Sequence, residues 1–132
     1  MKLPFKKAIE TNSAPSPVGP YNQAVLVNGW LYCSGQIPLD PLNGSMVGGG
    51  EVEAEAHQVI TNLKAVLNAA GAKTSQVVKT TIYLVDLKDF EKVNKIYSRT
   101  FSEGISPARA CVQVSALPKG ARIEIDCIAW LG

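Results

Sequence analysis

Apolar residues in this chain recur at two different periods, and this separates the predicted strands from the predicted helices. Short apolar runs at 24–27 and 30–34 predict two strands. They flank Asn28 and Gly29, a dipeptide that tolerates positive φ at both turn positions, so a type I′ β-hairpin is expected. The stretch 4–11 lies before a proline-rich loop and is predicted to be an edge strand.

Two stretches have the helical period instead. Apolar positions from 52 to 70 repeat every three or four residues, and Gly71 follows where a left-handed helix cap is needed. A second amphipathic helix is predicted at 87–103, with Asp86 available to cap its first turn. Between the two helices, residues 77–85 are β-branched and aromatic, which favours a strand.

The last third of the chain contains two more strand-like runs, 108–116 and 121–130, joined by a short turn-prone segment. We therefore predict a second β-hairpin, in which these strands are neighbours. The resulting order is βββαβαββ over a single domain, residues 1–132. This order is typical of an α+β fold, with a mixed sheet and two helices on one face.

Composition narrows the classes of function. Only 18% of the residues are charged, and the final strands have apolar residues on both faces. We therefore expect a closed ring of subunits to cover the sheet face that lacks helices. The net charge of +2 is scattered, and the only basic cluster in the sequence is Lys2, Lys6 and Lys7, so nucleic-acid binding is not favoured.

The three cysteines Cys33, Cys111 and Cys127 fall inside strand-like runs and form no CxxC motif. We interpret them as buried free thiols. An odd number of cysteines, with no signal sequence in residues 1–10, indicates a reducing compartment. We expect a cytoplasmic protein, or one in an organelle if its source is eukaryotic, with no membrane-spanning segment.

Common catalytic motifs are missing from the sequence. His57 is the only histidine and falls on a predicted helix, so neither a metal site with several histidines nor a Ser-His-Asp triad is supported. Gly48-Gly49-Gly50 lacks the lysine and hydroxyl of a phosphate-binding loop. We predict no metal and no cofactor.

Arg109 and Glu124 are charged residues inside predicted strands, where charges need partners. The fork of an arginine matches a carboxylate, and a glutamate between two isoleucines is either paired or desolvated. A four-residue hairpin loop would place Arg109, Cys111 and Gln113 on the face of Glu124, whereas a three-residue loop would separate them. The residues alone leave two alternatives open, a plain ion pair or a binding site.

These residues resemble the signature of a known family, the reactive intermediate deaminases, also called the RidA or YjgF family. The resemblance rests on Pro107-Ala108-Arg109-Ala110-Cys111-Val112 and Ile123-Glu124-Ile125. Further matches extend it from about residue 15 to the C-terminus: Gly19-Pro20-Tyr21 with Gln23-Ala24, Ser34-Gly35-Gln36-Ile37-Pro38, Asn62-Leu63, Ala69-Ala70-Gly71 and Asp86-Leu87. It implies a chorismate-mutase-like fold and a homotrimer whose sheets form an inner barrel, with three clefts between subunits.

The resemblance also implies an activity without metal or cofactor. Such proteins deaminate small imines and enamines that carry a carboxylate, such as 2-aminoacrylate and 2-iminobutanoate, to 2-keto acids and ammonia. Carried onto this sequence, Arg109 grips the substrate carboxylate and Glu124 positions the attacking water. The remaining site residues are expected to line the cleft (Tyr21, Ser34) or to orient the imine nitrogen through backbone groups (Gly35, Cys111).

Three other functions remain open from the sequence, one of them a chaperone-like or protein-interaction role that is attached to some relatives. The same cleft could bind keto acids in a regulatory subunit without turnover, because a fold does not determine an activity. An endoribonuclease or translation-inhibitor role is attached to some relatives, although the sequence has no basic stripe or aromatic platform for RNA.

Overall fold

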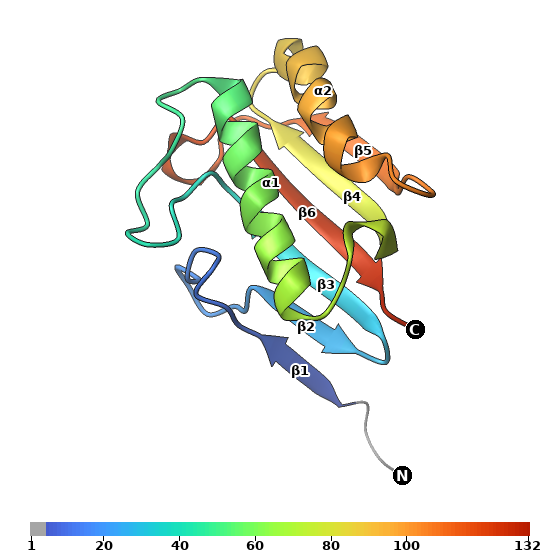
Figure 1. The fold of residues 1–132 in the computed structure, drawn as a ribbon. Coiled ribbons are helices and arrows are strands. Elements are labelled where there is room, and N and C mark those ends of the chain that lie inside the picture. Colours follow the sequence, from blue (N-terminus) through green and yellow to red (C-terminus); the bar gives the residue numbers. More distant parts are fainter. Residues whose placement is uncertain (1–4) are drawn as a thin grey trace.

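The structure is a computed structural model that describes residues 5–132, and it has a six-stranded sheet and two α-helices (Figure 1). The strands are β1 (Lys6–Ile9), β2 (Ala24–Val27), β3 (Trp30–Gln36), β4 (Val77–Leu84), β5 (Ala108–Gln113) and β6 (Ile123–Trp130). The helices are α1 (Val52–Ala69) and α2 (Phe90–Phe101), with short 3-10 turns η1 (Thr74–Gln76), η2 (Leu87–Asp89) and η3 (Pro118–Gly120). The predicted α+β class and element order are confirmed, while position 4 of the first predicted strand lies outside the described residues.

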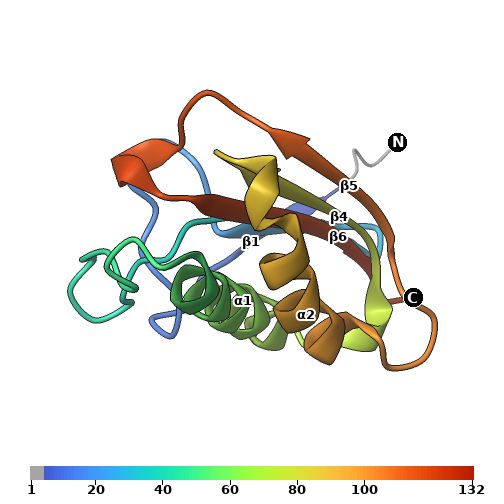
Figure 2. The same cartoon turned by 90° about the horizontal axis from the view of Figure 1, so that it is seen from above.

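Both helices cover the same face of the sheet, as predicted (Figure 2). The core lies between the two layers, where apolar side chains of α1 meet the inward side chains of β6. Leu63 and Val66 from α1 and Ile123 and Ile125 from β6 are fully buried. No helix within residues 5–132 is long and apolar enough to cross a membrane.

Local turn and cap chemistry follows the sequence. Asn28 and Gly29 have φ of 51° and 80°, and Val27 pairs with Trp30, so the predicted hairpin is present. Gly71 has φ of 77°, the left-handed conformation expected after α1. The Asp86 side chain accepts a hydrogen bond from the Lys88 N–H, although the first turn after it is 3-10 rather than α-helical.

The predicted hairpin between the last two strands is wrong. The strand order is β1-β2-β3-β6-β4-β5, so β4 lies between β5 and β6. β5 is parallel to β4, β6 is antiparallel to it, and β5 ends at Gln113 rather than at 116. Arg109 and Glu124 are therefore not on neighbouring strands.

Burial explains why β6 takes the inner position. Its inward side chains, Ile123, Ile125, Cys127 and Ala129, are all buried. Because its backbone is buried as well, β6 needs hydrogen-bonding partners on both sides, and β3 and β4 supply them. The chain returns from α2 beside β4, which makes β5 the edge strand. The connection from β5 to β6 then passes around the end of β4, where the Val114 N–H bonds to the Leu84 carbonyl and the Val85 N–H to the Arg122 carbonyl.

The sheet face without helices carries large exposed side chains. Trp30 and Trp130 lie on neighbouring strands with ring centroids 6.1 Å apart, and they are 40% and 50% exposed. Tyr32 and Val112 are also exposed. Apolar side chains in such a row favour burial against another surface.

Candidate functional site

Arg109 is oriented by α2. Phe90, Asn94 and Tyr97 follow each other at spacings of four and three residues, so they share the side of α2 that faces β5. The guanidinium carbon of Arg109 lies 5.3 Å from the Phe90 ring centroid and 5.0 Å from that of Tyr97. Its Nη1 donates a hydrogen bond to Asn94 Oδ1 at 2.7 Å. Two cation–π contacts and one hydrogen bond thus hold the guanidinium. These contacts do not use its remaining N–H groups, which can donate to a ligand.

A surface hollow of about 430 Å³ opens beside Arg109. Its wall is mostly polar and comes from α2 and from the segment before β5, including Ser98, Ser102 and Ser106. Beneath it, the Tyr97 and Thr80 hydroxyls are hydrogen-bonded at 2.7 Å, and burial raises the pKa of Tyr97. The phenol therefore stays neutral, and the hollow presents a cation among hydroxyl groups.

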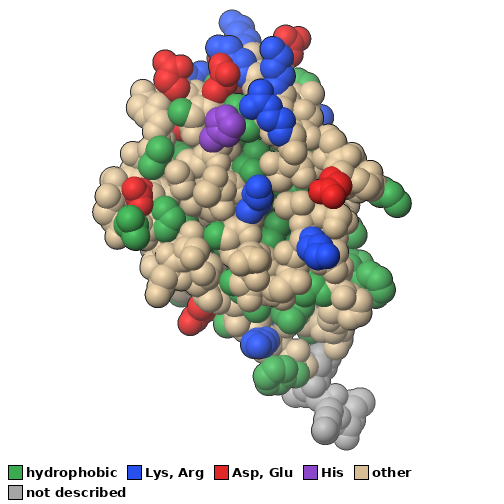
Figure 3. Space-filling view, in the orientation of Figure 1, with side chains coloured by type: hydrophobic (Ala, Val, Ile, Leu, Met, Phe, Trp, Pro, Cys, Tyr) green, Lys and Arg blue, Asp and Glu red, His purple; other side chains and the backbone are tan. Residues whose placement is uncertain are grey.

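A row of basic side chains runs along α2 and the turn before it. Lys88, Lys92, Lys95 and Arg99 are exposed and follow at spacings of four, three and four residues, which places them on one stripe of the helix. Figure 3 shows Lys and Arg side chains gathered near the top of the helix side, over the start of α2, with some acidic side chains among them. The expectation that the chain has no basic stripe is corrected, because the stripe depends on helical spacing rather than on a run of charges.

Cys111 also points toward the helices, where it packs against the core. Burial raises the pKa of its thiol, and the nearby Arg109 lowers it by less. The thiol is therefore protonated at neutral pH and is a poor nucleophile. This agrees with an interpretation in which the backbone of Cys111, rather than its sulfur, takes part in binding.

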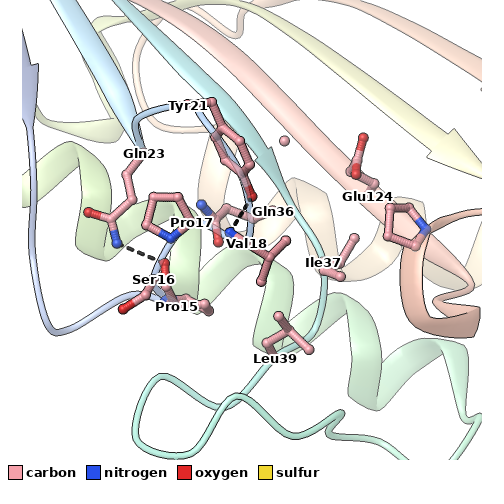
Figure 4. A pocket seen from close by; sticks show the side chains of 12 residues that line it. Pro15, Ser16, Pro17, Val18, Tyr21, Gln23, Gln36, Ile37, Leu39 and Glu124 are labelled. Carbon is pink, nitrogen blue, oxygen red and sulfur yellow. Dashed lines mark hydrogen bonds between the residues drawn. The ribbon is translucent and has the colours of Figure 1, made fainter.

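Glu124 lies in a second pocket, of about 70 Å³, on the other side of the sheet. Because Ile123 and Ile125 point into the core, the alternation of β6 turns Glu124 away from the helices. Figure 4 shows Glu124 and Tyr21 on either side of this pocket, one from β6 and one from the loop before β2. Burial, and then the neighbouring charge of Asp126, raises the pKa of Glu124.

Gly35 leaves the space that the Glu124 carboxylate occupies. A β-bulge between Cys33 and Gln36 interrupts the pairing of β3 with β6 at this point. A methyl group at Gly35 would lie 2.7 Å from the carboxyl carbon of Glu124, closer than atoms tolerate. A side chain at this position would displace the Glu124 carboxylate, so glycine is what lets Glu124 occupy this place.

The other two predicted cleft residues lie near this pocket. The Tyr21 hydroxyl accepts a hydrogen bond from the Val18 N–H at 3.3 Å, which orients its ring over the pocket. The Ser34 hydroxyl donates to the Asn22 carbonyl at 2.6 Å, and the Ser34 N–H donates to the Gln23 carbonyl. Ser34 thus ties β3 to the loop that carries Tyr21.

Gln23 belongs to the residues that match the family, but no role in the site was predicted for it from the sequence. Its side chain is 3% exposed and donates to the carbonyls of Thr11, Ala14 and Pro15, while its Oε1 accepts from the Thr11 N–H. One buried amide thereby fixes the proline-rich loop that lines the pocket. No spacing in the sequence indicates this role, because the partners are irregular backbone groups.

Asn62 supports the opposite wall from α1. Its Nδ2 donates to the carbonyls of Ile37 and Leu39 at 3.2 and 2.9 Å, and both of these residues line the pocket. Asn62 is fully buried, so an amide without hydrogen-bonding partners at this position would destabilise the fold. The helix layer therefore holds the loop after β3 in place.

A second buried contact sets the start of β6. Glu55 on α1 accepts a hydrogen bond from the Arg122 N–H at 2.8 Å, and the Arg122 guanidinium forms an ion pair with Asp89 at 2.7 Å. Arg122 Nη1 also donates to the Gly50 carbonyl. These contacts fix the backbone two residues before Glu124.

The two half-sites do not meet within one subunit. Arg109, Cys111 and Gln113 point toward α2, and the Gln113 Oε1 accepts from the Leu87 N–H at 2.9 Å. Glu124 points to the opposite face, so of the two alternatives left open by the sequence, the one that places all four residues on one face is wrong. The prediction assumed a direct β5–β6 pairing, and the inserted β4 changes both the distance and the register. Within residues 5–132, no group of three His, Cys, Asp or Glu side chains could hold a metal ion.

Comparisons with known proteins bear on this arrangement. The family model described as Endoribonuclease L-PSP matches residues 11–131. The chain belongs to this family. A solved structure of a Rid family protein, YyfA from Yersinia pestis, has the same fold with a TM-score of 0.92 and 48% identity, covering 96% of this chain and 99% of that one. The resemblance to the reactive intermediate deaminase family is therefore confirmed.

Relatives in this family have different names. A RutC family protein from Synechocystis is 54% identical over 125 residues, 95% of this chain and 96% of its own length. A mouse protein named 2-iminobutanoate/2-iminopropanoate deaminase is 51% identical over 128 residues, 97% of this chain and 93% of its own length. The sequence similarity thus extends over nearly the whole length of this chain and of both relatives.

Proposed function

We propose that this chain hydrolyses small imines and enamines that carry a carboxylate, and releases a 2-keto acid and ammonia. Substrates of the 2-iminobutanoate and 2-aminoacrylate type belong to this class. The observation that carries the proposal is the pair of half-sites, an oriented Arg109 guanidinium and a partly buried Glu124 carboxylate. Mouse and human relatives named 2-iminobutanoate/2-iminopropanoate deaminase support the same reaction.

The complete site is proposed to form between subunits of a homotrimer. Arg109 on the edge strand of one subunit would meet the Glu124 pocket of the next, since one subunit holds these groups on opposite faces. The exposed row that includes Trp30, Tyr32 and Trp130 supports this assembly, because a trimer with inward-turned sheets would cover it. Sedimentation showing a stable monomer at micromolar concentration would contradict it.

Arg109 is assigned to the substrate carboxylate. Its fork can bind both carboxylate oxygens, and the contacts with Phe90, Tyr97 and Asn94 fix the plane of the guanidinium before substrate arrives. The bound carboxylate would hold the adjacent imine carbon in one position. Such positioning reduces the entropy that the reaction must lose at its barrier.

Glu124 is assigned to the water. The carbon of a protonated imine is already electrophilic, so hydrolysis needs a positioned water and a group that takes its proton. A carboxylate with a raised pKa is a stronger base than an ordinary surface glutamate, and Glu124 has this property. Backbone groups of Gly35 and Cys111 would orient the nitrogen, while Tyr21 and Ser34 would shape the cleft.

The decisive experiment couples a threonine or serine dehydratase to this protein and follows the release of 2-keto acid. The buffer is chosen to slow spontaneous imine hydrolysis. Acceleration by catalytic amounts of the protein is expected. A protein that binds the 2-keto acid without accelerating its release would instead be a metabolite-binding regulator.

A further inference from the structure

Four polar side chains lie close together on the helix-free face of the sheet, two on β4 and two on β6. In the pairing of β4 with β6, Tyr83 lies opposite Glu124 and Thr81 lies opposite Asp126. Side chains alternate along a strand, so Glu124 and Asp126 point the same way. The Tyr83 hydroxyl donates a hydrogen bond to Asp126 Oδ2 at 3.0 Å.

We propose that Asp126, held by Tyr83, is a positioning residue that keeps Glu124 able to accept and return a proton during imine hydrolysis. Asp126 would act through Glu124 and would not touch the substrate. The inference rests on the proposed function. It gives a role to Tyr83 and Asp126, which have none in the site described above.

The geometry supports an electrostatic effect of this kind. Two residues along a strand separate Glu124 and Asp126 by about 6.7 Å, which is within the range of about 8–10 Å over which salt leaves charges unscreened. Glu124 is partly buried, so water weakens the repulsion less than it would on an open surface. Repulsion between the two carboxylates favours a proton on Glu124, in agreement with the raised pKa of this group.

Tyr83 keeps the second carboxylate in place. Burial, and then the hydrogen bond to Asp126, raises the pKa of the Tyr83 phenol, so the phenol remains a donor throughout the neutral range. The hydrogen bond fixes the Asp126 carboxylate against β4 rather than letting it turn into solvent. The charge therefore stays at a set distance from Glu124.

Other charged or titratable groups lie around Glu124. Lys79 lies two pairs further along β4, opposite Ile128, and Lys119 lies in the turn that also places Pro118 at the pocket. Tyr21 faces Glu124 from the loop before β2. In the proposed trimer, Arg109 of a neighbouring subunit would add a positive charge. Among the charged groups of residues 5–132, Asp126 is the one whose charge raises the pKa of Glu124.

In this reaction, Glu124 carries one proton from water to the substrate nitrogen. Water adds to the carbon of the protonated imine, the C=N electron pair becomes the nitrogen lone pair, and Glu124 takes the proton that water loses. Glu124 then returns this proton to the nitrogen, the C–N bond breaks, and its electrons leave with ammonia. The hydroxyl proton of the new carbonyl passes to the ammonia, which yields ammonium and the 2-keto acid. A glutamate of ordinary acidity would hold the first proton less well.

The test measures the titration of Glu124 directly, by carbon-13 NMR of the labelled glutamate carboxyls, and the pH dependence of kcat/KM in parallel. Glu124→Gln identifies the resonance. Asp126→Asn keeps the shape of the side chain and the hydrogen bond from Tyr83, so it should fold, and it removes the charge. We expect the Glu124 midpoint and the acid limb of the pH profile to move to lower pH, with kcat reduced at neutral pH.

Two variants complete the experiment. Tyr83→Phe should move the midpoint in the same direction by a smaller amount, because the Asp126 charge remains but is no longer held. Glu53→Gln, on the exposed first turn of α1, removes a distant carboxylate and should leave both measurements unchanged.

The outcomes separate the inference from the proposed function. An unchanged Glu124 midpoint in Asp126→Asn, or an equal shift in Glu53→Gln, overturns the inference even if the wild-type protein is an active deaminase. A shifted midpoint in a protein that does not accelerate imine hydrolysis overturns the proposed function, and with it the catalytic meaning of the pair.

Discussion

Arg109 and Glu124 lie on opposite faces of one sheet, with β4 between their strands. The two groups that the deaminase chemistry needs are therefore separated in every single subunit. Activity should depend on assembly, since only a neighbouring subunit can bring the second group to the first.

Arg109→Ala should abolish deaminase activity while leaving the oligomer intact. Loss of a charged hydrogen-bonding partner costs about 2–5 kcal/mol, so kcat/KM should fall by about 30-fold or more. Arg109→Lys should restore little, because an ammonium lacks the planar fork and stacks differently on Phe90 and Tyr97. Steady-state kinetics with Lys64→Ala, an exposed cation on α1, is the control.

Gly35→Ala should inactivate the protein by displacing Glu124. The added methyl group would lie 2.7 Å from the Glu124 carboxyl group. Gly19→Ala is a matched control, since its methyl group would make ordinary contacts at 3.6 Å with the Tyr21 ring. Kinetics and thermal unfolding of both variants check this, and full activity in Gly35→Ala would remove Glu124 from the mechanism.

Glu124→Gln should stabilise the fold near neutral pH while removing activity. The pKa of Glu124 is raised above its ordinary 4.5, so the folded chain favours the protonated form. Stability from this group is full below the ordinary pKa and is lost as pH rises through the raised one. The melting temperature of the variant should therefore exceed that of the wild type at pH 7, and the difference should vanish at low pH.

Gln23→Leu should destabilise the protein by about 2–4 kcal/mol, because several buried backbone groups lose their partner at once. The proline-rich loop would then lose the contacts that fix it against the pocket. Chemical denaturation measures the loss. Gln113→Ala, which removes a single exposed hydrogen bond to the Leu87 N–H, should cost about 1 kcal/mol or less.

The basic stripe lies on the side of α2 away from the residues that contact Arg109, but its summed field should still increase the rate at which anionic substrate reaches Arg109. Charges of one sign near a site raise association rates, and salt weakens the effect. We expect kcat/KM to fall as ionic strength rises, and to fall further in the double variant Lys92→Gln and Lys95→Gln with little change in kcat. Lys7→Gln on β1, at the far edge of the sheet, is the control. A salt-independent kcat/KM would exclude steering by the stripe.

Features of this protein that depend on residues close together in the chain could be predicted from the sequence. The Asn28-Gly29 hairpin and the Gly71 cap follow from φ preferences, and the two helices follow from apolar spacing within 52–70 and 87–103. The family signature also brought out Arg109 and Glu124 as the charged residues to explain. These features need no knowledge of which strands pair.

Only the tertiary structure decided how those residues are arranged. Strand pairing joins segments far apart in the chain, and nothing in residues 108–130 indicates that β4 lies between β5 and β6. That insertion sends Arg109 and Glu124 to opposite faces. It also places Tyr83 opposite Glu124, beside Asp126. The chemistry of each site residue could thus be anticipated from its type, whereas its partners depend on long-range contacts that local patterns do not encode.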